Sequence, residues 1–247
     1  MRLLLGSGGF RTEERRTSLR ARMREHFGEV RSILFVPWAL DDHDGYLRAM
    51  REGGFDAGYR LEGIHEHADP VRAVEEAEAL YVGGGNSFRL VEALHLRGLI
   101  EPVRARVRDG MPFMGVSAGT NAACPTMMTT NDMPIVQPPS FETFALVGFQ
   151  VNPHYYAGNI WMREGERFVE HFGETRDQRI AEFHQRNPQP VVGLWEGAFL
   201  IVRDATMRLA GGDARVFRRG ADPEDHADCA DLSALLTESA APAGAAD

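Results

Sequence analysis

The sequence contains no lysine, so all 27 of its basic residues are arginines. The missing amino groups exclude a Walker-type phosphate-binding loop, Schiff-base chemistry, anchoring of pyridoxal phosphate and a Ser-Lys hydrolase. Cysteine is also scarce, with only Cys124 and Cys229. Two thiols are too few for a disulfide framework or a cysteine-rich zinc site.

Long apolar runs and an excess of positive charge are absent too. No apolar stretch approaches the length of a membrane span, and the run in Arg2–Leu5 is too short for a signal peptide. Acidic residues outnumber basic ones by 36 to 27, which gives a formal net charge of −9 at pH 7. A general nucleic-acid-binding protein needs a basic face that releases counterions. We therefore expect a cytoplasmic protein with no nucleic-acid partner and no membrane partner.

The chain is long enough for a large buried core. It has 247 residues, 43% of them apolar and 26% charged, which fits one large domain or two small ones. Short apolar runs, such as Ser32–Pro37 and Pro112–Val116, alternate with segments of helical periodicity, such as Thr12–Phe27. This alternation predicts an α/β fold, a doubly wound and mostly parallel sheet with helices on both faces.

The second half of the chain has a different pattern. The stretch Pro125–Pro153 is rich in proline, Met, Phe, Val and Ile, and we interpret it as an ordered, functional connection. Closely spaced apolar runs then predict antiparallel strands at one edge of the sheet, near the C-terminus: Val191–Leu194, Ala198–Val202 and Met207–Ala210. We expect residues 1–220 to form a single α/β domain and residues 221–247, rich in Ala and Asp, to form a partly disordered tail.

The sharpest chemical signal is the G-x-S-x-G motif at Gly115–Gly119, which lies between a predicted strand and a segment that can start a helix. This context is typical of a nucleophile elbow, in which a tight turn lifts Ser117 above the edge of the sheet. The amide of Ala118 would then point to the position where an oxyanion forms. The alternative is an ordinary strand-to-helix turn in which the serine caps the helix.

A second glycine-rich motif, Gly83-Gly84-Gly85-Asn86, also follows a predicted strand. Glycines allow the backbone to approach a ligand closely and to adopt a positive φ. At the same edge of the sheet as Ser117, the amide of Gly85 would supply a second oxyanion donor. The alternative is a nucleotide-binding loop, which is disfavoured because the spacing is not G-x-G-x-x-G and no lysine follows.

A serine nucleophile needs a base, and the base needs an acid that orients it. Among the 9 histidines, His154 differs from the others because it follows a short apolar run instead of lying in a charged or helical context. Two acids are candidates for orienting it. Asp132 gives the chain order Ser…Asp…His of serine hydrolases, whereas Glu196 follows a predicted strand. The alternative for Asp132 is a structural role in its loop.

Together these motifs resemble the peptidase E group of α-aspartyl dipeptidases, in serine-peptidase family S51. The resemblance covers about residues 1–220 and rests on these segments: Val82–Phe88, Gly115–Gly119, Cys124–Thr126, Thr129–Val136, Asn152–His154, Gly173–Ile180 and Glu196–Gly197. It implies an α/β fold like that of the class-I glutamine amidotransferases and cleavage of dipeptides that have a free N-terminal aspartate. It also implies that the reaction uses a serine and needs neither a metal nor a cofactor.

The resemblance implies a role for individual residues as well. Ser117 would be the nucleophile and His154 the general base and then acid, with either Asp132 or Glu196 as the third member. Arg176 would bind the side-chain carboxylate of the substrate, because a guanidinium fork binds a carboxylate through two hydrogen bonds.

Other consequences of the resemblance concern the surroundings of this site. Asn86 is expected to contribute to substrate binding. The segment Tyr155–Phe172 is longer and bulkier than in enterobacterial relatives, so substrate entry or contacts between subunits can differ there. The sequence leaves open whether the chain forms a homodimer.

Two other functions compete with an α-aspartyl dipeptidase. One is a cyanophycinase-like peptidase that acts on β-aspartyl-arginine polymer, and it would need acidic groups near the entrance of the site. The other is a non-catalytic small-molecule-binding domain on the same fold, against which the presence of both Ser117 and His154 argues.

Overall fold

The computed structural model describes residues 1–238 of the chain. Its largest unit is a seven-stranded sheet with the strand order β11-β10-β1-β5-β4-β2-β3. The strands from β1 to β3 in this order run parallel, whereas β10 is antiparallel to β1 and β11 is antiparallel to β10. Their bounds are β1 (Arg2–Gly6), β2 (Ser32–Val36), β3 (Arg60–Gly63), β4 (Leu80–Val82), β5 (Phe113–Val116), β10 (Phe199–Arg203) and β11 (Thr206–Ala210).

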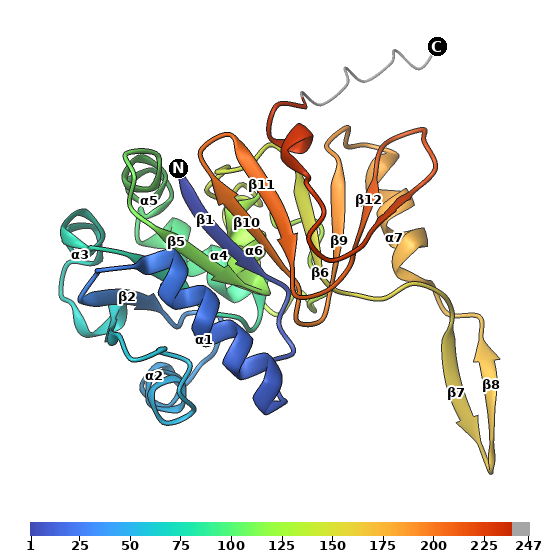
Figure 1. Cartoon of the computed structure of the whole chain (residues 1–247), viewed down its shortest axis with the longest axis horizontal. Helices are drawn as coiled ribbons and strands as arrows, with labels where there is room; N and C mark the ends of the chain where they lie inside the picture. The colour runs from blue at the N-terminus through green and yellow to red at the C-terminus, as the bar shows by residue number, and fades with distance from the viewer. Residues whose placement is uncertain (239–247) are drawn as a thin grey trace.

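Helices cover both faces of this sheet, as Figure 1 shows. Alternate residues of β1 enter different cores: Leu4 packs with α1 and α2, whereas Leu3 and Leu5 belong to the core that includes residues of α3, α4, α5 and α6. Both faces are therefore buried, which explains why these strands are apolar throughout. The helices are α1 (Glu13–Phe27), α2 (His43–Glu52), α3 (Pro70–Glu76), α4 (Ser87–Leu96), α5 (Ile100–Arg108) and α6 (Ala118–Ala123), with a 3-10 turn at Ile64–Glu66.

A second sheet of four strands packs beside the first, in the order β13-β12-β9-β6. Strands β6 and β9 are parallel, and the other neighbours are antiparallel. The bounds are β6 (Gln150–Tyr155), β9 (Val191–Trp195), β12 (Ala214–Phe217) and β13 (Glu224–His226), and α7 (Arg176–His184) covers one face. On the other face, Val151, Val192 and Val216 join the core of the large sheet.

The predicted doubly wound α/β fold with an antiparallel C-terminal edge is confirmed in the large sheet, where β10 and β11 form that edge. The run at Val191–Leu194 is different, because it forms β9 in the second sheet and pairs with β6. Periodicity cannot distinguish these outcomes, since an apolar strand is buried in either sheet.

A hairpin separates β6 from α7 and occupies the segment that the sequence marked as long and bulky. Strands β7 (Ile160–Glu164) and β8 (Arg167–His171) form a two-stranded sheet of their own, and Figure 1 shows it extending away from the body of the protein. Trp161 and Phe168 are 60% and 68% exposed. The hairpin therefore adds little to the core.

The residues after Gly220 continue the fold in the part that is described. Strand β13 pairs with β12, and a 3-10 turn at Ser233–Leu236 follows it. Leu232 and Leu235 are buried in the main core. The rest of the predicted tail, residues 239–247, lies outside the described residues. Among residues 1–238, no helix has the length and hydropathy required to cross a membrane.

Candidate active site

Ser117 occupies a strained turn between β5 and α6. Its φ of 54° and ψ of −112° lie in a region that residues other than glycine rarely adopt. The turn requires glycine on both sides. A Cβ atom at Gly115 would lie 2.3 Å from the carbonyl oxygen of Gly119, and one at Gly119 would lie 2.0 Å from that of Val82. Steric exclusion of any Cβ atom therefore explains why both positions are glycine. The turn has the form of a nucleophile elbow.

The hydroxyl of Ser117 meets a histidine and a carboxylate in a continuous chain of contacts. Oγ of Ser117 lies 2.8 Å from Nε2 of His154, and Nδ1 of His154 lies 2.7 Å from Oε1 of Glu196. Because an ionised carboxylate only accepts hydrogen bonds, Glu196 favours the tautomer that carries its proton on Nδ1. Nε2 is then free to accept the hydroxyl proton of Ser117.

The imidazole and carboxylate are open to a ligand. The side chains of His154 and Glu196 are 39% and 42% exposed. An ion pair with this exposure contributes little to stability. We therefore infer that the contact between His154 and Glu196 serves the chemistry of the site and not the stability of the fold.

Asp132, the other predicted orienting acid, lies elsewhere. Its Oδ2 accepts hydrogen bonds from the amide of Ser87, at 2.7 Å, and from the hydroxyl of Thr130, at 2.9 Å. Ser87 is the first residue of α4, where free amides and the helix dipole favour a carboxylate. The structure thus brings Glu196 to the imidazole and gives Asp132 a contact with a helix N-terminus.

Of the two predicted oxyanion donors, Ala118 directly follows Ser117, and Gly85 follows Gly84 in the loop after β4. A Cβ atom at Gly84 would lie 3.2 Å from Cβ of Ser117, so the loop after β4 touches the elbow. Gly85 has a φ of 135°, and a Cβ there would lie 2.5 Å from a backbone oxygen of Ala39. Within residues 1–238, the amides of Gly85 and Ala118 donate to no protein acceptor. Both amides therefore remain available to a ligand.

Asn86, which was predicted to bind substrate, has its side-chain amide bonded to the protein at both ends. Its Oδ1 caps α4 by accepting a hydrogen bond from the amide of Arg89, at 3.1 Å. Its Nδ2 donates to the carbonyl oxygen of Met133, at 2.9 Å. Both ends of the amide are thus occupied by the protein, and these bonds join α4 to the segment that contains Asp132.

Arg176 is a half-buried cation at the first turn of α7. It donates from Nη1 to Oδ1 of Asn131, and its guanidinium lies 5.4 Å from the ring centre of Tyr156. Its Nε is buried and has no partner in the part of the chain that is described. Burial lowers the pKa of this guanidinium, because loss of water disfavours the charged form.

Asn131 connects Arg176 to the catalytic histidine candidate, and sequence reasoning assigned no role to it. Its Nδ2 donates to the carbonyl oxygen of Pro153, at 2.8 Å, and its Oδ1 accepts from Nδ2 of Asn152, at 2.8 Å. Pro153 directly precedes His154. Asn131 lies in the family-like segment Thr129–Val136, but only its contacts show that it bonds to the backbone beside His154.

The loop after β1 is the part of the site that sequence reasoning missed. A Cβ atom at Gly8 would lie 2.6 Å from Cε1 of His154, and one at Gly9 would lie 2.1 Å from Oε2 of Glu196. The missed signal is the run Gly6-Ser7-Gly8-Gly9 after a buried strand, since the same pattern singled out the loop after β4.

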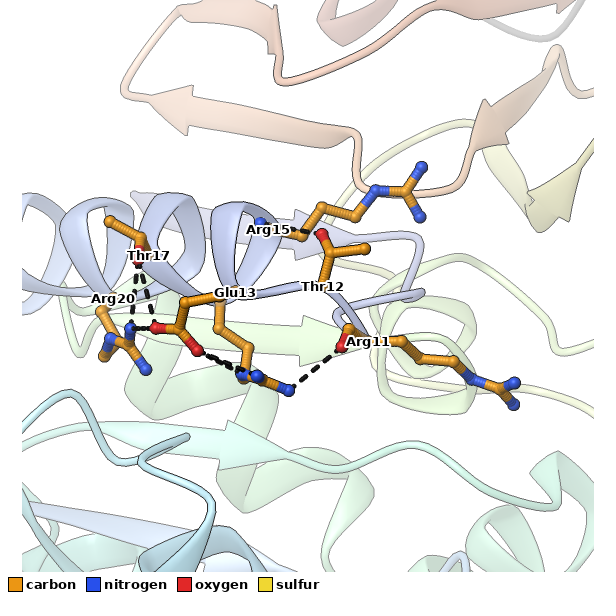
Figure 2. Close-up of polar contacts among 7 residues, drawn as sticks. Arg11, Thr12, Glu13, Arg15, Thr17 and Arg20 are labelled. Carbon is orange, nitrogen blue, oxygen red and sulfur yellow. Dashed lines mark hydrogen bonds and ion pairs between the residues drawn. The ribbon is translucent and has the colours of Figure 1, made fainter.

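Helix α1 holds this loop in place. Nη1 of Arg15 donates to the carbonyl oxygen of Gly9 at 3.0 Å, and Nη1 of Arg16 donates to that of Arg11 at 3.1 Å. Figure 2 shows Arg15 extending away from the ion pairs that Glu13 makes on the other side of the helix. The loop is therefore anchored at its backbone on both sides of the helix.

Comparisons with known proteins agree with this geometry. The family model of peptidase family S51 matches residues 2–210. Peptidase E of Streptomyces coelicolor is 50% identical over 205 residues, which cover 83% of this chain and 82% of that protein. A probable alpha-aspartyl dipeptidase of Drosophila melanogaster is 43% identical over 209 residues, which cover 84% of each chain.

The chain belongs to peptidase family S51. The family that the sequence motifs indicated is therefore confirmed, and with it the class of serine peptidases. Among solved structures, the crystal structure of a peptidase from an acI-B1 Actinobacterium matches this S51 peptidase with a TM-score of 0.64 and 16% identity. The match covers 94% of this chain and 96% of the actinobacterial peptidase. At 16% identity, the likeness concerns the fold alone.

The part of the chain that the structure describes contains no cluster of metal-binding side chains. Among residues 1–238, no group of three or more His, Cys, Asp or Glu side chains is arranged to hold a metal ion. At the site itself, His154 and Glu196 bind each other.

Proposed function

We propose that this S51 peptidase hydrolyses dipeptides with a free N-terminal aspartate, through an acyl-enzyme on Ser117. The observation that carries the proposal is Arg176, a half-buried guanidinium that is linked through Asn131 to the residue before His154. Its Nε has no hydrogen-bond partner among residues 1–238. A buried cation without a counter-ion is costly, and an anionic ligand removes that cost. The names of the relatives, peptidase E and alpha-aspartyl dipeptidase, support an aspartyl substrate.

The first half of the proposed reaction forms the acyl-enzyme. His154 Nε2 accepts the proton of Ser117 as Oγ attacks the carbonyl carbon of the aspartyl residue. The amides of Gly85 and Ala118 donate to the oxygen that becomes negative. His154 then donates its proton to the leaving amine, and the bond between the two residues breaks.

The second half releases aspartate. A water molecule gives a proton to His154 and attacks the acyl carbon, and Ser117 leaves with a proton from His154. Glu196 remains ionised in both halves and stabilises the imidazolium that forms twice.

Arg176 would select the substrate. A planar guanidinium donates two parallel hydrogen bonds to a carboxylate, whereas a neutral amide offers only one acceptor oxygen and no charge. Removal of such a partner from a site built for it costs orders of magnitude in rate, because the buried polar group remains unpaired. Asp-Xaa dipeptides should therefore react much faster than Asn-Xaa dipeptides.

Other predictions about the setting of this activity stay predictions. They are a cytoplasmic location, the lack of nucleic-acid and membrane partners, and the open choice between monomer and homodimer. The small peptide substrate is the partner that we propose here.

The test is a dipeptide panel on the wild type and Arg176→Met. We expect the wild type to prefer Asp-Leu over Asn-Leu and Glu-Leu, and the variant to lose about 10³-fold in kcat/KM on Asp-Leu only. Arg179→Met is the matched control, because Arg179 lies on the same helix and is 52% exposed. An unchanged preference in Arg176→Met, or faster cleavage of β-Asp-Arg than of Asp-Leu by the wild type, would contradict the proposal.

A further inference from the structure

Ser7 has a fully buried hydroxyl group that contacts β6, which carries His154, and β9, which precedes Glu196. It directly follows β1 and is 0% exposed. Its Oγ donates to the carbonyl oxygen of Leu194 at 2.8 Å and accepts from the amide of His154 at 2.8 Å. Leu194 belongs to β9, two residues before Glu196. One hydroxyl thus fixes the backbone beside both members of the His–Glu pair.

The same chain segment also holds the nucleophile. The carbonyl oxygen of Gly6, at the end of β1, accepts a hydrogen bond from the amide of Ser117 at 3.0 Å. Ser7 itself donates its amide to the carbonyl oxygen of Ala198 at 3.0 Å, beyond the turn that contains Glu196. The end of β1 is therefore bonded to the backbone at or beside Ser117, His154 and Glu196.

His154 needs an external partner of this kind. The register between β6 and β9 shifts between Asn152 and Tyr155, so His154 lies where the regular strand pairing is interrupted. Its φ of 55° is left-handed, a conformation that costs about 1–3 kcal/mol for such a residue unless its surroundings impose it. The hydroxyl of Ser7 satisfies the amide that this irregularity leaves free.

We propose that Ser7 is a positioning residue for the proposed hydrolysis, on which this inference rests. Through the backbone of His154 and Leu194, it keeps Nε2 close to Oγ of Ser117 and Oε1 close to Nδ1. Loss of the hydroxyl leaves a buried amide and a buried carbonyl group unpaired, so the backbone at His154 relaxes. A displacement of about 1 Å at a reacting group costs about 10²-fold in rate.

The experiment compares Ser7→Ala, Ser7→Cys and Ser7→Thr with Thr143→Val. Thr143 is the matched control because it is also 0% exposed, and its hydroxyl donates to the carbonyl oxygen of Cys124 at 2.6 Å. Two rates are measured well below the melting temperatures: labelling of Ser117 by phenylmethanesulfonyl fluoride, and turnover of Asp-Leu. Circular dichroism follows folding.

We expect Ser7→Ala to lower kcat and the labelling rate by about 10- to 100-fold with KM nearly unchanged, because substrate binding is not affected. Ser7→Cys should be intermediate, since a thiol is a weak hydrogen-bonding group. Ser7→Thr should recover most of the rate, because it keeps the hydroxyl. Thr143→Val should lose stability but keep both rates.

Three results would overturn the inference. They are wild-type rates in Ser7→Ala, equal losses in Ser7→Ala and Thr143→Val, and loss of the fold in both Ser7→Ala and Ser7→Cys, which would make the role purely structural. Failure of the proposed function has a different signature, because the wild type would then neither be labelled at Ser117 nor cleave Asp-Leu. In that case the positioning role falls with it.

Discussion

The two sheets of this peptidase contribute different halves of the site. The seven-stranded sheet carries Ser117 after β5, and the loop after β4 that touches it. The four-stranded sheet carries His154 on β6 and Glu196 after β9, and its covering helix α7 begins with Arg176. The turn at Ser117 is therefore built by one strand and one helix, whereas the contact between Ser117 and His154 forms only where the two sheets meet.

Ser117 and His154, the proposed nucleophile and base, share one backbone feature. Ser117 follows β5 of the large sheet and has a φ of 54°, and His154 lies on β6 of the second sheet and has a φ of 55°. A left-handed residue turns the chain sharply and directs its side chain out of the regular strand. Each sheet thus places one residue with a positive φ at the site, and the packing of the two sheets brings their side chains together.

The largest expected effect comes from removal of the proposed nucleophile, Ser117, which follows β5 of the large sheet. Ser117→Ala should lower kcat on Asp-Leu by about 10⁵-fold or more, because no other group can form the acyl-enzyme. The melting temperature should hardly change, since Ser117 is not part of a core. The measurement is a steady-state assay together with a thermal melt. A variant that keeps even a tenth of the wild-type activity would remove Ser117 from the mechanism.

A second pair of variants sharpens the comparison between the sheets. Glu196→Gln should lower kcat by about 10³-fold, because an amide can stabilise the wrong tautomer of His154 and carries no charge for the imidazolium. Asp132→Asn should change kcat by less than about threefold and cost about 1 kcal/mol of stability, because it weakens the contact with α4. Kinetics and urea unfolding measure the two effects. The reversed pattern would assign the orienting role to Asp132.

The last prediction concerns stability in acid and not catalysis, and it tests a buried histidine that packs against the large sheet, away from the site. Burial, assisted by the nearby Arg2, lowers the pKa of His26 on α1 to about 3. The unfolded chain binds this proton near pH 6.5, so stability is complete above that pH and falls as the pH decreases towards 3. Between pH 6.5 and pH 5 the expected loss is about 2 kcal/mol.

His26→Met should flatten this part of the stability–pH curve, measured by urea unfolding at several pH values. His67→Gln is the control, because His67 is exposed. An unchanged slope in His26→Met would show that other groups cause the acid sensitivity.

The sequence predicted the parts of the site that local geometry determines. Ser117 lies in a turn whose glycines have steric reasons, so a five-residue pattern was sufficient to find it. His154 followed from its position beyond an apolar run. The choice between Asp132 and Glu196 depended on how the sheets pack, because both lie in turns and neither spacing excludes the other.

What the sequence did not predict has the same physical origin. Strand β9 belongs to the second sheet, although its apolar residues would suit either sheet. The hydroxyl of Ser7 contacts His154 and Leu194, which are 147 and 187 residues away in the chain. Periodicity reports which residues are buried, but not which distant segment buries them. In the sequence, Ser7 is one small residue in the run Gly6-Ser7-Gly8-Gly9, and nothing there indicates its contacts.

The hairpin of β7 and β8 has a practical consequence. Its first and last residues, Ile160 and His171, are paired with each other, so the chain leaves and re-enters the body of the protein at one point. The spacing between His154 and Arg176 is therefore independent of hairpin length. We therefore expect the tight turn at Gly165, farthest from that point, to accept an inserted reporter domain or affinity tag.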